Sequence, residues 1–452
     1  MDRDRVEPAV TTIPGDRAEA WVNYHHEHAA LSTPAYEFVW DLTAPAIGPF
    51  CTDVDGNVFL DFTSQVGASP MGYNHPSIAE RLEAVSLPIP TKIAGQSIYA
   101  SGGWPPEDAA LPSAPQLMDA LTDLTSSYDL DTVFLSNSGA EAVENALKLC
   151  YAHRPSAMKG VTCLGAFHGR TLGALSLNRS KAVHRRHFPS IAGIHELPFC
   201  TDRACQASTC SCGFFVGSEN RSRLQEMLDP NGGYVDPDEI AYIVFEPIQG
   251  EGGYRFPSEA FSAELQTVSE EHDIPLIADE IQTGLGRTGE WWAVDHVAVE
   301  PDVITSAKAL QVGATIGRKE MFPDKPGRIS STWGAGDLIS TAIGLTTIEV
   351  IQEQNLLEHV RNQGAVFLEA LRDARLPGVT NVRGQGLMLA FDLPTKSDMQ
   401  EVVRAALERG LLVLSCGRRT VRLLPPLDLT DRELELGISL LESAVQAVDM
   451  TD

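Results

Sequence analysis

Two residues near the middle of the chain have the types and spacing needed for cofactor chemistry. Asp279 and Lys308 lie 29 positions apart (308 − 279 = 29), and each follows a short apolar run that predicts a buried strand. A strand ending on a carboxylate, followed by one ending on a lone amine, suits pyridoxal phosphate (PLP). The amine would hold the cofactor as a Schiff base, and the carboxylate would keep the pyridine nitrogen protonated. Taken alone, these two residues are explained more simply as a strand-end Asp and a surface Lys that never meet. The flanking motifs therefore decide whether they form a cofactor site.

A candidate anion site precedes this pair. Residues 137–142 follow a predicted strand at 132–135 and open a predicted helix at 140–153. The N–H groups at a helix start attract anions, Gly139 allows close approach to a phosphate, and the Ser138 hydroxyl can donate to it. A helix cap without any ligand explains the same residues.

Phe167 and Arg170 lie just beyond another predicted strand, 161–164. The aromatic ring is suited to stacking on a pyridine, and the guanidinium is suited to pairing with a substrate carboxylate. A buried Phe and a solvated Arg would account for both residues equally well.

Two further strand ends carry polar residues. Residues 246–253 contain two carboxylates and three glycines, and Glu251 among them can pair with a cation and release it. Gln282 follows Asp279 by three positions, where its amide can donate to the phenolic oxygen of the cofactor. A turn with a surface Glu is the alternative for the first segment. A strand-end Asp in apolar surroundings needs a positive group opposite it.

These strands alternate with helical segments, which predicts a mostly parallel sheet with helices on both faces. Past residue 340 the pattern predicts a smaller α+β unit. Residues 36–40 and 58–62 are predicted to be the strands of an N-terminal hairpin that turns at 53–57. The expected domains are residues 1–75, an arm and hairpin that pack with the small domain, 76–340, a large cofactor-binding domain, and 341–452, the small domain.

Composition restricts the class of protein. The net charge of −27, from 34 basic and 61 acidic residues, argues against nucleic acid and anionic membranes as partners. The first ten residues have no apolar core of a secretory signal, and no apolar run reaches the length of a membrane span, so we expect a cytoplasmic protein. Lys is scarce, which fits adaptation to high salt and fits a plain acidic enzyme equally well.

Five motifs in order resemble the class III (ω-amino) aminotransferases, PLP enzymes of fold type I: NSGAEAVENALK, FHGRT, FEPIQGEGG, DEIQTGLGRTG and SAK, the last ending at Lys308. GYNHP at residues 72–76 also fits, and the similarity runs from about residue 35 to the C-terminus. The resemblance implies an α/β fold in which a large domain, built on a mostly parallel sheet of the seven-stranded type, is joined to a smaller α+β domain.

The resemblance also implies roles for individual residues. Lys308 is similar to the Schiff-base lysine that moves a proton, Asp279 to the partner of the pyridine nitrogen, and Gln282 to the contact of the phenolic oxygen. Ser138, Gly139 and Ala140 resemble the phosphate cup, and Phe167 the stacking ring. Thr332 resembles a Thr that reaches the phosphate of a neighbouring subunit, which implies a homodimer with sites at the interface.

The resemblance indicates the substrate less directly than the cofactor. The sequences after Lys308 and after Thr332 resemble lysine ε-aminotransferase more than 4-aminobutyrate or ornithine aminotransferase, and Arg170 and Arg422 fit that subgroup. Arg422 is similar to an arginine that alternates between Glu251 and a substrate carboxylate. The implied reaction moves a terminal amino group of lysine, ornithine or 4-aminobutyrate to 2-oxoglutarate. Racemisation of an amino acid on the same scaffold stays open, as does assembly beyond the dimer.

Four of the eight cysteines crowd into thirteen positions. Cys200, Cys205, Cys210 and Cys212 have the spacing C-x4-C-x4-C-x-C, which is not a standard zinc-finger spacing. They could close around one metal ion or remain thiols in a surface insertion.

Overall fold

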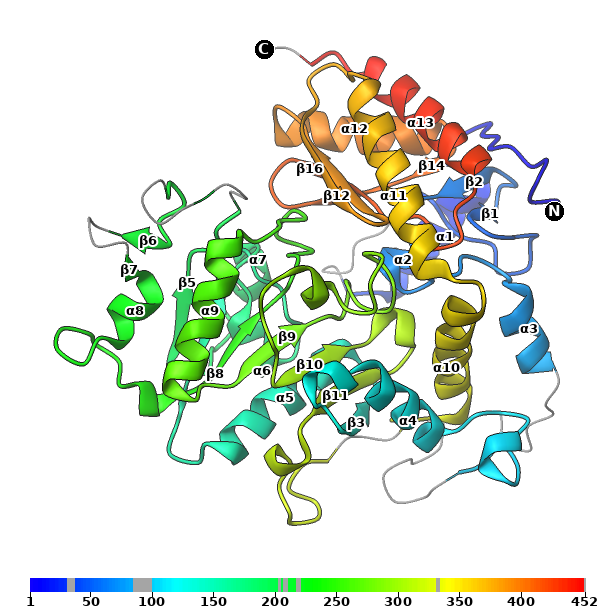
Figure 1. Cartoon of the computed structure of the whole chain (residues 1–452). Helices are drawn as coiled ribbons and strands as arrows, with labels where there is room; N and C mark the ends of the chain where they lie inside the picture. The colour runs from blue at the N-terminus through cyan, green and yellow to red at the C-terminus, as the bar shows by residue number, and fades with distance from the viewer. Residues whose placement is uncertain are drawn as a thin grey trace. The chain divides into compact units, whose positions relative to one another are not determined.

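The computed structural model describes residues 1–30, 37–83, 100–201, 205, 210–216, 221–330 and 334–450. The chain divides into two compact units (Figure 1). The large unit is Glu80–Leu357, and the small unit joins Met1–Ala79 to Glu358–Asp452. Among the described residues, no helix combines the length and hydrophobicity that a membrane span requires.

A seven-stranded sheet forms the centre of the large unit. Its strands, in spatial order, are β3 (Thr132–Ser136), β11 (Gly313–Gly317), β10 (Val303–Ser306), β9 (Leu276–Asp279), β8 (Ile240–Phe245), β4 (Lys159–Cys163) and β5 (Ile194–Leu197). In this sheet β11 alone runs against the others. The predicted mostly parallel sheet is therefore confirmed.

Helices cover both faces of this sheet, as the alternation of side chains along β8 shows. Tyr242 and Val244 pack in one cluster with residues of α5 (Gly139–His153). Ile243 and Phe245 face the other way and pack with residues of α9 (Glu259–His272). Because β8 is buried on both faces, its sequence is continuously apolar rather than alternating.

The remaining elements of the large unit are shorter or peripheral. They are α4 (Ala114–Leu124), α6 (Leu172–Leu177), α7 (Ala182–Arg185), β6 (Phe215–Val216), β7 (Arg221–Ser222), α8 (Arg223–Leu228) and α10 (Leu338–Glu353), with α3 (Pro76–Glu83) and α11 (Leu356–Asp373) spanning the unit boundaries. Helix α10 packs on α4.

The small unit contains two sheets. One has the order β1 (Phe50–Thr52), β2 (Val58–Asp61), β14 (Leu411–Leu412), and the other β12 (Thr380–Gln385), β13 (Met388–Asp392), β16 (Thr420–Leu423), β15 (Leu414–Cys416). Its helices are α1 (Asp16–His28), α2 (Ser64–Gly67), α12 (Lys396–Glu408) and α13 (Asp431–Gln446). Strand β14 pairs in parallel with β2, so segments from the two ends of the chain share one sheet.

The predicted N-terminal hairpin is half right. The turn is where the sequence places it, because Asp53 accepts hydrogen bonds from the N–H groups of Asp55 (3.0 Å) and Asn57 (2.8 Å). The first predicted strand is wrong over its described residues 37–40: β1 begins at Phe50, and Trp40 forms only an isolated bridge with Asp53. Tyr36, the first residue of that prediction, lies outside the described residues. Phe38 and Trp40 instead pack on the hairpin through their side chains, with the Phe38 ring 5.0 Å from the Phe59 ring.

Candidate active site

Asp279 and Lys308 emerge at the same edge of the central sheet. Strands β9 and β10 are adjacent and parallel, and Asp279 pairs in register with Thr305. Lys308 follows three residues later, as the first residue of a short 3-10 helix (Lys308–Leu310). Asp279 is 4% exposed and Lys308 is half-buried. Neighbouring parallel strands thus bring both groups to the carboxyl edge of the sheet, where ligands bind in such folds.

His168 fixes the Asp279 carboxylate. It follows β4, and its Nδ1 lies 2.7 Å from Asp279 Oδ2 with both side chains buried. The Asn178 side chain accepts the backbone N–H of His168 at 2.7 Å, which fixes the loop. Burial acts to lower the pKa of His168, but the hydrogen bond and charge of Asp279 raise it above its ordinary value. His168 was not among the predicted site residues, although its place just past a strand end was a usable signal.

A second buried carboxylate ties two loops together at this edge. Glu246 directly follows β8 and accepts the N–H of Phe167 through Oε1 (2.9 Å) and the N–H of Gly250 through Oε2 (2.8 Å). Burial raises its pKa to about 7. Glu246 therefore holds the loop after β4 against the loop after β8, a positioning function that the sequence did not reveal.

The candidate phosphate cup lies at the start of α5. Ser138 is the N-cap, and its hydroxyl accepts the N–H of Glu141 at 3.2 Å. Gly139 and Ala140 form the first turn, whose N–H groups have no acceptor within a helix. A Cβ on Gly139 would lie 2.8 Å from Cδ1 of Ile281. The helix start therefore lies against the segment that follows Asp279.

Phe167 and Arg170 contact each other. The Arg170 guanidinium carbon lies 5.4 Å from the centroid of the Phe167 ring, and His184 meets the same ring edge-on at 5.4 Å. Arg170 is exposed and Phe167 is half-buried. A charged side chain thus lies on the ring that the sequence assigns to stacking.

Two other predicted residues lie in loops at this edge. Glu251 Oε2 is 3.3 Å from Lys181 Nζ. The buried Oε1 of Gln282 has no hydrogen-bond partner among the described residues, and a Cβ on Gly250 would come within 2.8 Å of it. A side-chain amide with an unsatisfied atom next to Asp279 fits a polar ligand at this position.

The last two predicted residues are not placed at this edge. Arg422 lies on β16 of the small unit and is 4% exposed. Its alternation with Glu251 therefore stays a prediction. Thr332 lies outside the described residues.

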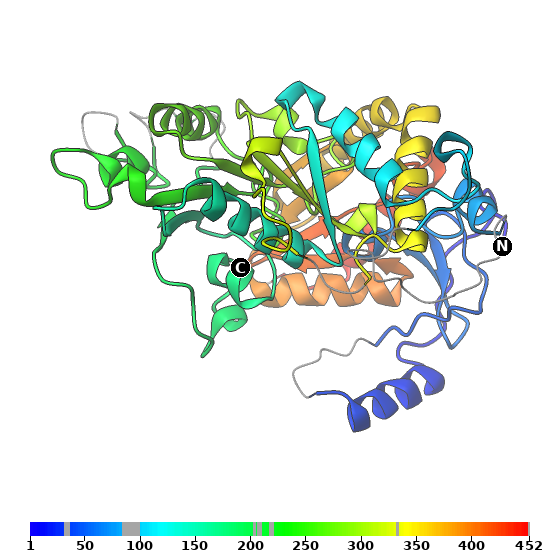
Figure 2. The same cartoon turned by 90° about the horizontal axis from the view of Figure 1, so that it is seen from below.

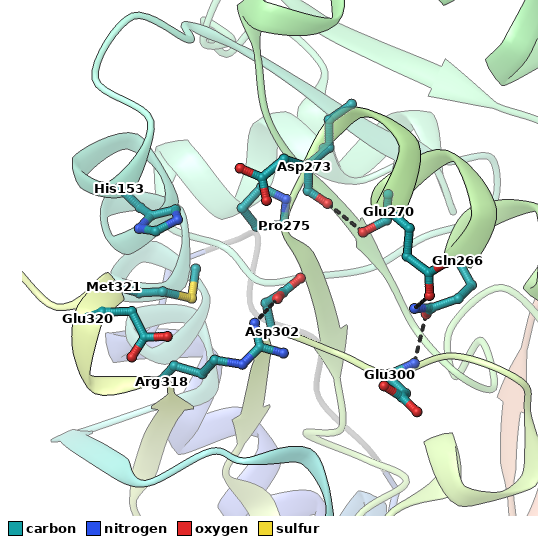
Figure 3. Close-up of a pocket in the computed structure, with 12 residues that line it drawn as sticks. His153, Gln266, Glu270, Asp273, Pro275, Glu300, Asp302, Arg318, Glu320 and Met321 are labelled. Atoms are coloured by element: carbon teal, nitrogen blue, oxygen red, sulfur yellow. Dashed lines mark hydrogen bonds and ion pairs between the residues drawn. The ribbon is translucent and has the colours of Figure 1, made fainter.

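A cavity of about 360 Å³ lies at the opposite edge of the sheet (Figure 3). Pro275 precedes β9, Asp302 precedes β10, and Arg318 follows the reversed strand β11, so the cavity is at the amino edge of the parallel strands. Glu270, Asp273, Glu300, Asp302 and Glu320 are among its lining residues, and Figure 3 shows Arg318 paired with Asp302. Ligands of parallel sheets bind at the carboxyl edge, so this cavity is not the candidate active site.

The residues at the carboxyl edge fit PLP. They supply an amine, a buried carboxylate held by His168, an aromatic ring and the start of a 15-residue helix. Together these groups match the aldehyde, ring nitrogen, ring face and phosphate of that cofactor.

Comparison with known proteins supports this assignment. Residues 39–445 match the family model described as aminotransferase class-III. An acetylornithine aminotransferase of Archaeoglobus fulgidus is 32% identical over 400 residues, which cover 87% of this chain and 92% of that protein. An alanine/serine racemase of Pyrococcus horikoshii is 31% identical over 458 residues, covering 97% and 92%.

The fold agrees with a solved structure over nearly the whole chain. A lysine aminotransferase from M. tuberculosis superposes with a TM-score of 0.81 at 27% identity, covering 96% of this chain and 100% of that one. The fold is therefore that of fold type I PLP enzymes, and PLP is the cofactor. The chain belongs to the class III aminotransferase family.

Proposed function

We propose that this enzyme transfers the terminal amino group of an amino acid to 2-oxoglutarate, giving a semialdehyde and glutamate. Lysine, ornithine and 4-aminobutyrate are the leading donors. The observation that carries the proposal is the placement of Asp279 and Lys308 on adjacent parallel strands at one sheet edge. The names of the acetylornithine and lysine aminotransferases support a terminal amine as the group that is transferred.

The chemistry divides between cofactor and protein. PLP, when bound, supplies an electron sink beside the amine-bearing carbon of the substrate. Lys308 Nζ would hold the cofactor and then take a proton from that carbon as general base. Asp279 would keep a negative charge against the ring nitrogen, and His168, hydrogen-bonded to its Oδ2, would fix the direction of that carboxylate. Gln282 would donate its amide N–H to the phenolic oxygen.

Other predicted residues would bind and orient. Ser138, Gly139 and Ala140 would hold the phosphate at the start of α5. Arg170 and Arg422 would receive substrate carboxylates. Glu251 would pair with Arg422 when no carboxylate is present and release it to 2-oxoglutarate.

We also propose a homodimer in which Thr332 of one chain reaches the phosphate held by the other. Helix α1 stands apart from the other elements of its unit in Figure 2. It carries Trp21 and Tyr24, which are 55% and 58% exposed. Exposed aromatic side chains close together are typical of protein contacts. The cytoplasmic location stays a prediction.

Racemisation is the second candidate. The alanine/serine racemase matches 97% of this chain, compared with 87% for the acetylornithine aminotransferase. A racemase returns the proton to the carbon it came from, on the other face, and consumes no 2-oxo acid. Both reactions begin with proton removal by Lys308, so product analysis must separate them.

The test is incubation of the purified enzyme with L-lysine, L-ornithine, 4-aminobutyrate, L-alanine, L-serine and L-leucine, with and without 2-oxoglutarate. We expect glutamate to form only when both the keto acid and a donor with a terminal amine are present. Loss of optical activity without any keto acid would overturn transfer in favour of racemisation.

Lys308→Ala tests the role of the lysine in the same assay. We expect it to abolish the visible absorbance of the bound cofactor and lower turnover by at least about a hundredfold, because the general base is lost. Lys396→Ala, at an exposed position of the small unit, is the matched control and should retain both. A Lys308→Ala enzyme that keeps its visible band would contradict the assignment.

A further inference from the structure

Four sulfur atoms meet at the far edge of the large unit. Cys200, Cys205 and Cys210 each place Sγ within 4.8 Å of the other two, and Cys212 Sγ lies 3.2 Å from Cys210 Sγ. We call these four residues the thiol cluster. It follows β5, the outermost strand of the sheet, so β4 and β8 separate its strand from β9 and Asp279. The cluster is thus distinct from the candidate active site.

The distances between these sulfurs suit a shared ion. Four thiolates around one tetrahedral zinc ion at about 2.3 Å lie about 3.8 Å from one another. Cys210 Sγ and Cys212 Sγ are 3.2 Å apart, and the sulfurs of Cys200, Cys205 and Cys210 all lie within 4.8 Å of one another, so these separations are compatible with that value. A disulfide would require about 2.05 Å. None of the eight cysteines is joined in one.

Backbone N–H groups point at two of the sulfurs. The N–H of Phe215 donates to Cys210 Sγ at 3.5 Å, and the N–H of Phe214 donates to Cys212 Sγ at 3.4 Å. The turn that aims them depends on Gly213, which has φ +83° and open space where a side chain would lie. Such donors stabilise negative charge on sulfur, which is the form that binds metal.

The short hairpin beside the thiol cluster also needs additional support. Strands β6 and β7 have two residues each, and a hairpin of that size is marginal without support. Its apolar support includes Phe214, whose ring lies 4.7 Å from that of Phe261 on α9. The thiol cluster joins the chain just past β5 to this hairpin. An ion bound there would therefore tie the hairpin to the end of β5.

We propose that Cys200, Cys205, Cys210 and Cys212 bind one zinc ion through four sulfurs, and that the ion is structural. All four positions of a tetrahedral ion are then filled by protein, which leaves none for substrate or water. The ion links Cys200, just past β5, to Cys210 and Cys212, just before β6. The proposal does not depend on which amino donor the enzyme uses.

The experiment measures metal in the full-length holoenzyme. After dialysis against metal-free buffer, elemental mass spectrometry should find about one zinc per chain. A mercurial reagent that titrates the thiols should release that zinc in proportion. Cobalt substitution should give the visible bands of a tetrahedral thiolate site, read against enzyme freed of PLP so that the cofactor does not interfere.

Variants locate the ion. Cys212→Ala and Cys205→Ala should each lose nearly all the zinc, whereas Cys150→Ala, which removes a buried thiol from α5, should retain it. The wild-type measurements decide the matter even if a cluster variant fails to fold. Wild-type enzyme without bound metal that also binds no cobalt, a Cys210–Cys212 disulfide in its place, or iron instead of zinc would each overturn the assignment.

Discussion

Asp279 illustrates how a side chain is prepared for one task by the groups around it. Its Oδ2 is bonded to His168, and its Oδ1 accepts the Thr305 hydroxyl at 3.3 Å and the Ile281 N–H at 3.2 Å. These donors come from the segments after β4 and β9 and from β10. A charge held by three segments does not need to reorganise when a cation arrives, which is the condition for electrostatic catalysis.

Glu280, the next residue along the chain, allows the effect of burial to be tested by varying the pH. Glu280 is 1% exposed and accepts the N–H of Val294 at 2.7 Å and the hydroxyl of Thr283. Burial raises its pKa to about 7. A raised pKa means that the folded state holds the proton more tightly than the unfolded chain. The resulting stability is complete below about pH 4.5 and is lost as the pH rises to about 7.

Glu280→Gln should remove this loss. The amide can keep both contacts, since its oxygen accepts from Val294 and its nitrogen donates to the Thr283 oxygen. We expect the free energy of unfolding, variant minus wild type, to grow by up to about 3 kcal/mol from pH 5 to pH 8. Urea unfolding at a series of pH values measures it, with exposed Glu435→Gln as the control. A difference that stays constant with pH would contradict the argument.

The proposed role of Arg422 can be tested by comparing substrates with and without an α-carboxylate. If it receives the carboxylate of 2-oxoglutarate, Arg422→Ala should lower kcat/KM for that substrate at least about thirtyfold more than for a donor without an α-carboxylate. Arg383→Ala is the matched control, because Arg383 lies in the same sheet but pairs with Asp392 at 2.9 Å. Equal losses for both substrates would count against alternation with Glu251.

At the scale of elements, the long periodic segments were predictable from sequence. The helix predicted at 140–153 is α5 (Gly139–His153), and the strand predicted at 242–245 is β8 (Ile240–Phe245). Each carries its own pattern of apolar residues, so local reading was sufficient. The mostly parallel arrangement followed from the alternation of strands with helices.

What the sequence could not give depends on distant partners. Residues 36–40 have strand-like composition, but β2 takes β1 on one side and β14, from near position 411, on the other. Likewise the role of Glu246 became visible only when β4 and β8 proved adjacent and its two oxygens met two loops. Pairing between distant segments is a tertiary property that local propensity does not encode.

The approach of β11 to the phosphate cup gives a test at this scale. A Cβ on Gly313 would lie 2.3 Å from both Ser136 Oγ and the backbone oxygen of Ser138. Gly313→Ala must therefore displace the start of α5, and we expect the Kd for PLP to rise at least about tenfold. Titration of apo-enzyme with PLP measures it. Gly232→Ala, with open space around its Cβ, should bind as wild type, and an unchanged Kd in Gly313→Ala would contradict the placement of the cup.

At the scale of the whole molecule, the proposed homodimer implies that one chain does not complete a site alone. A net charge of −27 on each chain would make two copies repel. A stable dimer then needs a contact large enough to offset that repulsion, and a shared active site is a functional reason to keep such a contact. Thr332, which the resemblance places at the phosphate of the neighbouring chain, makes this testable without knowledge of the interface.

Complementation between two inactive variants tests the shared site. In a mixed dimer of Lys308→Ala and Thr332→Ala chains, one site lacks both groups and the other has the wild-type lysine together with the wild-type threonine of its partner. Random exchange of equal amounts should therefore restore about a quarter of wild-type activity at limiting PLP. Lys308→Ala mixed with Asp279→Asn is the negative control, since each site then lacks a residue of its own chain. If the first mixture shows no more activity than the average of its two components, each chain holds its phosphate alone and the proposed role of Thr332 is wrong.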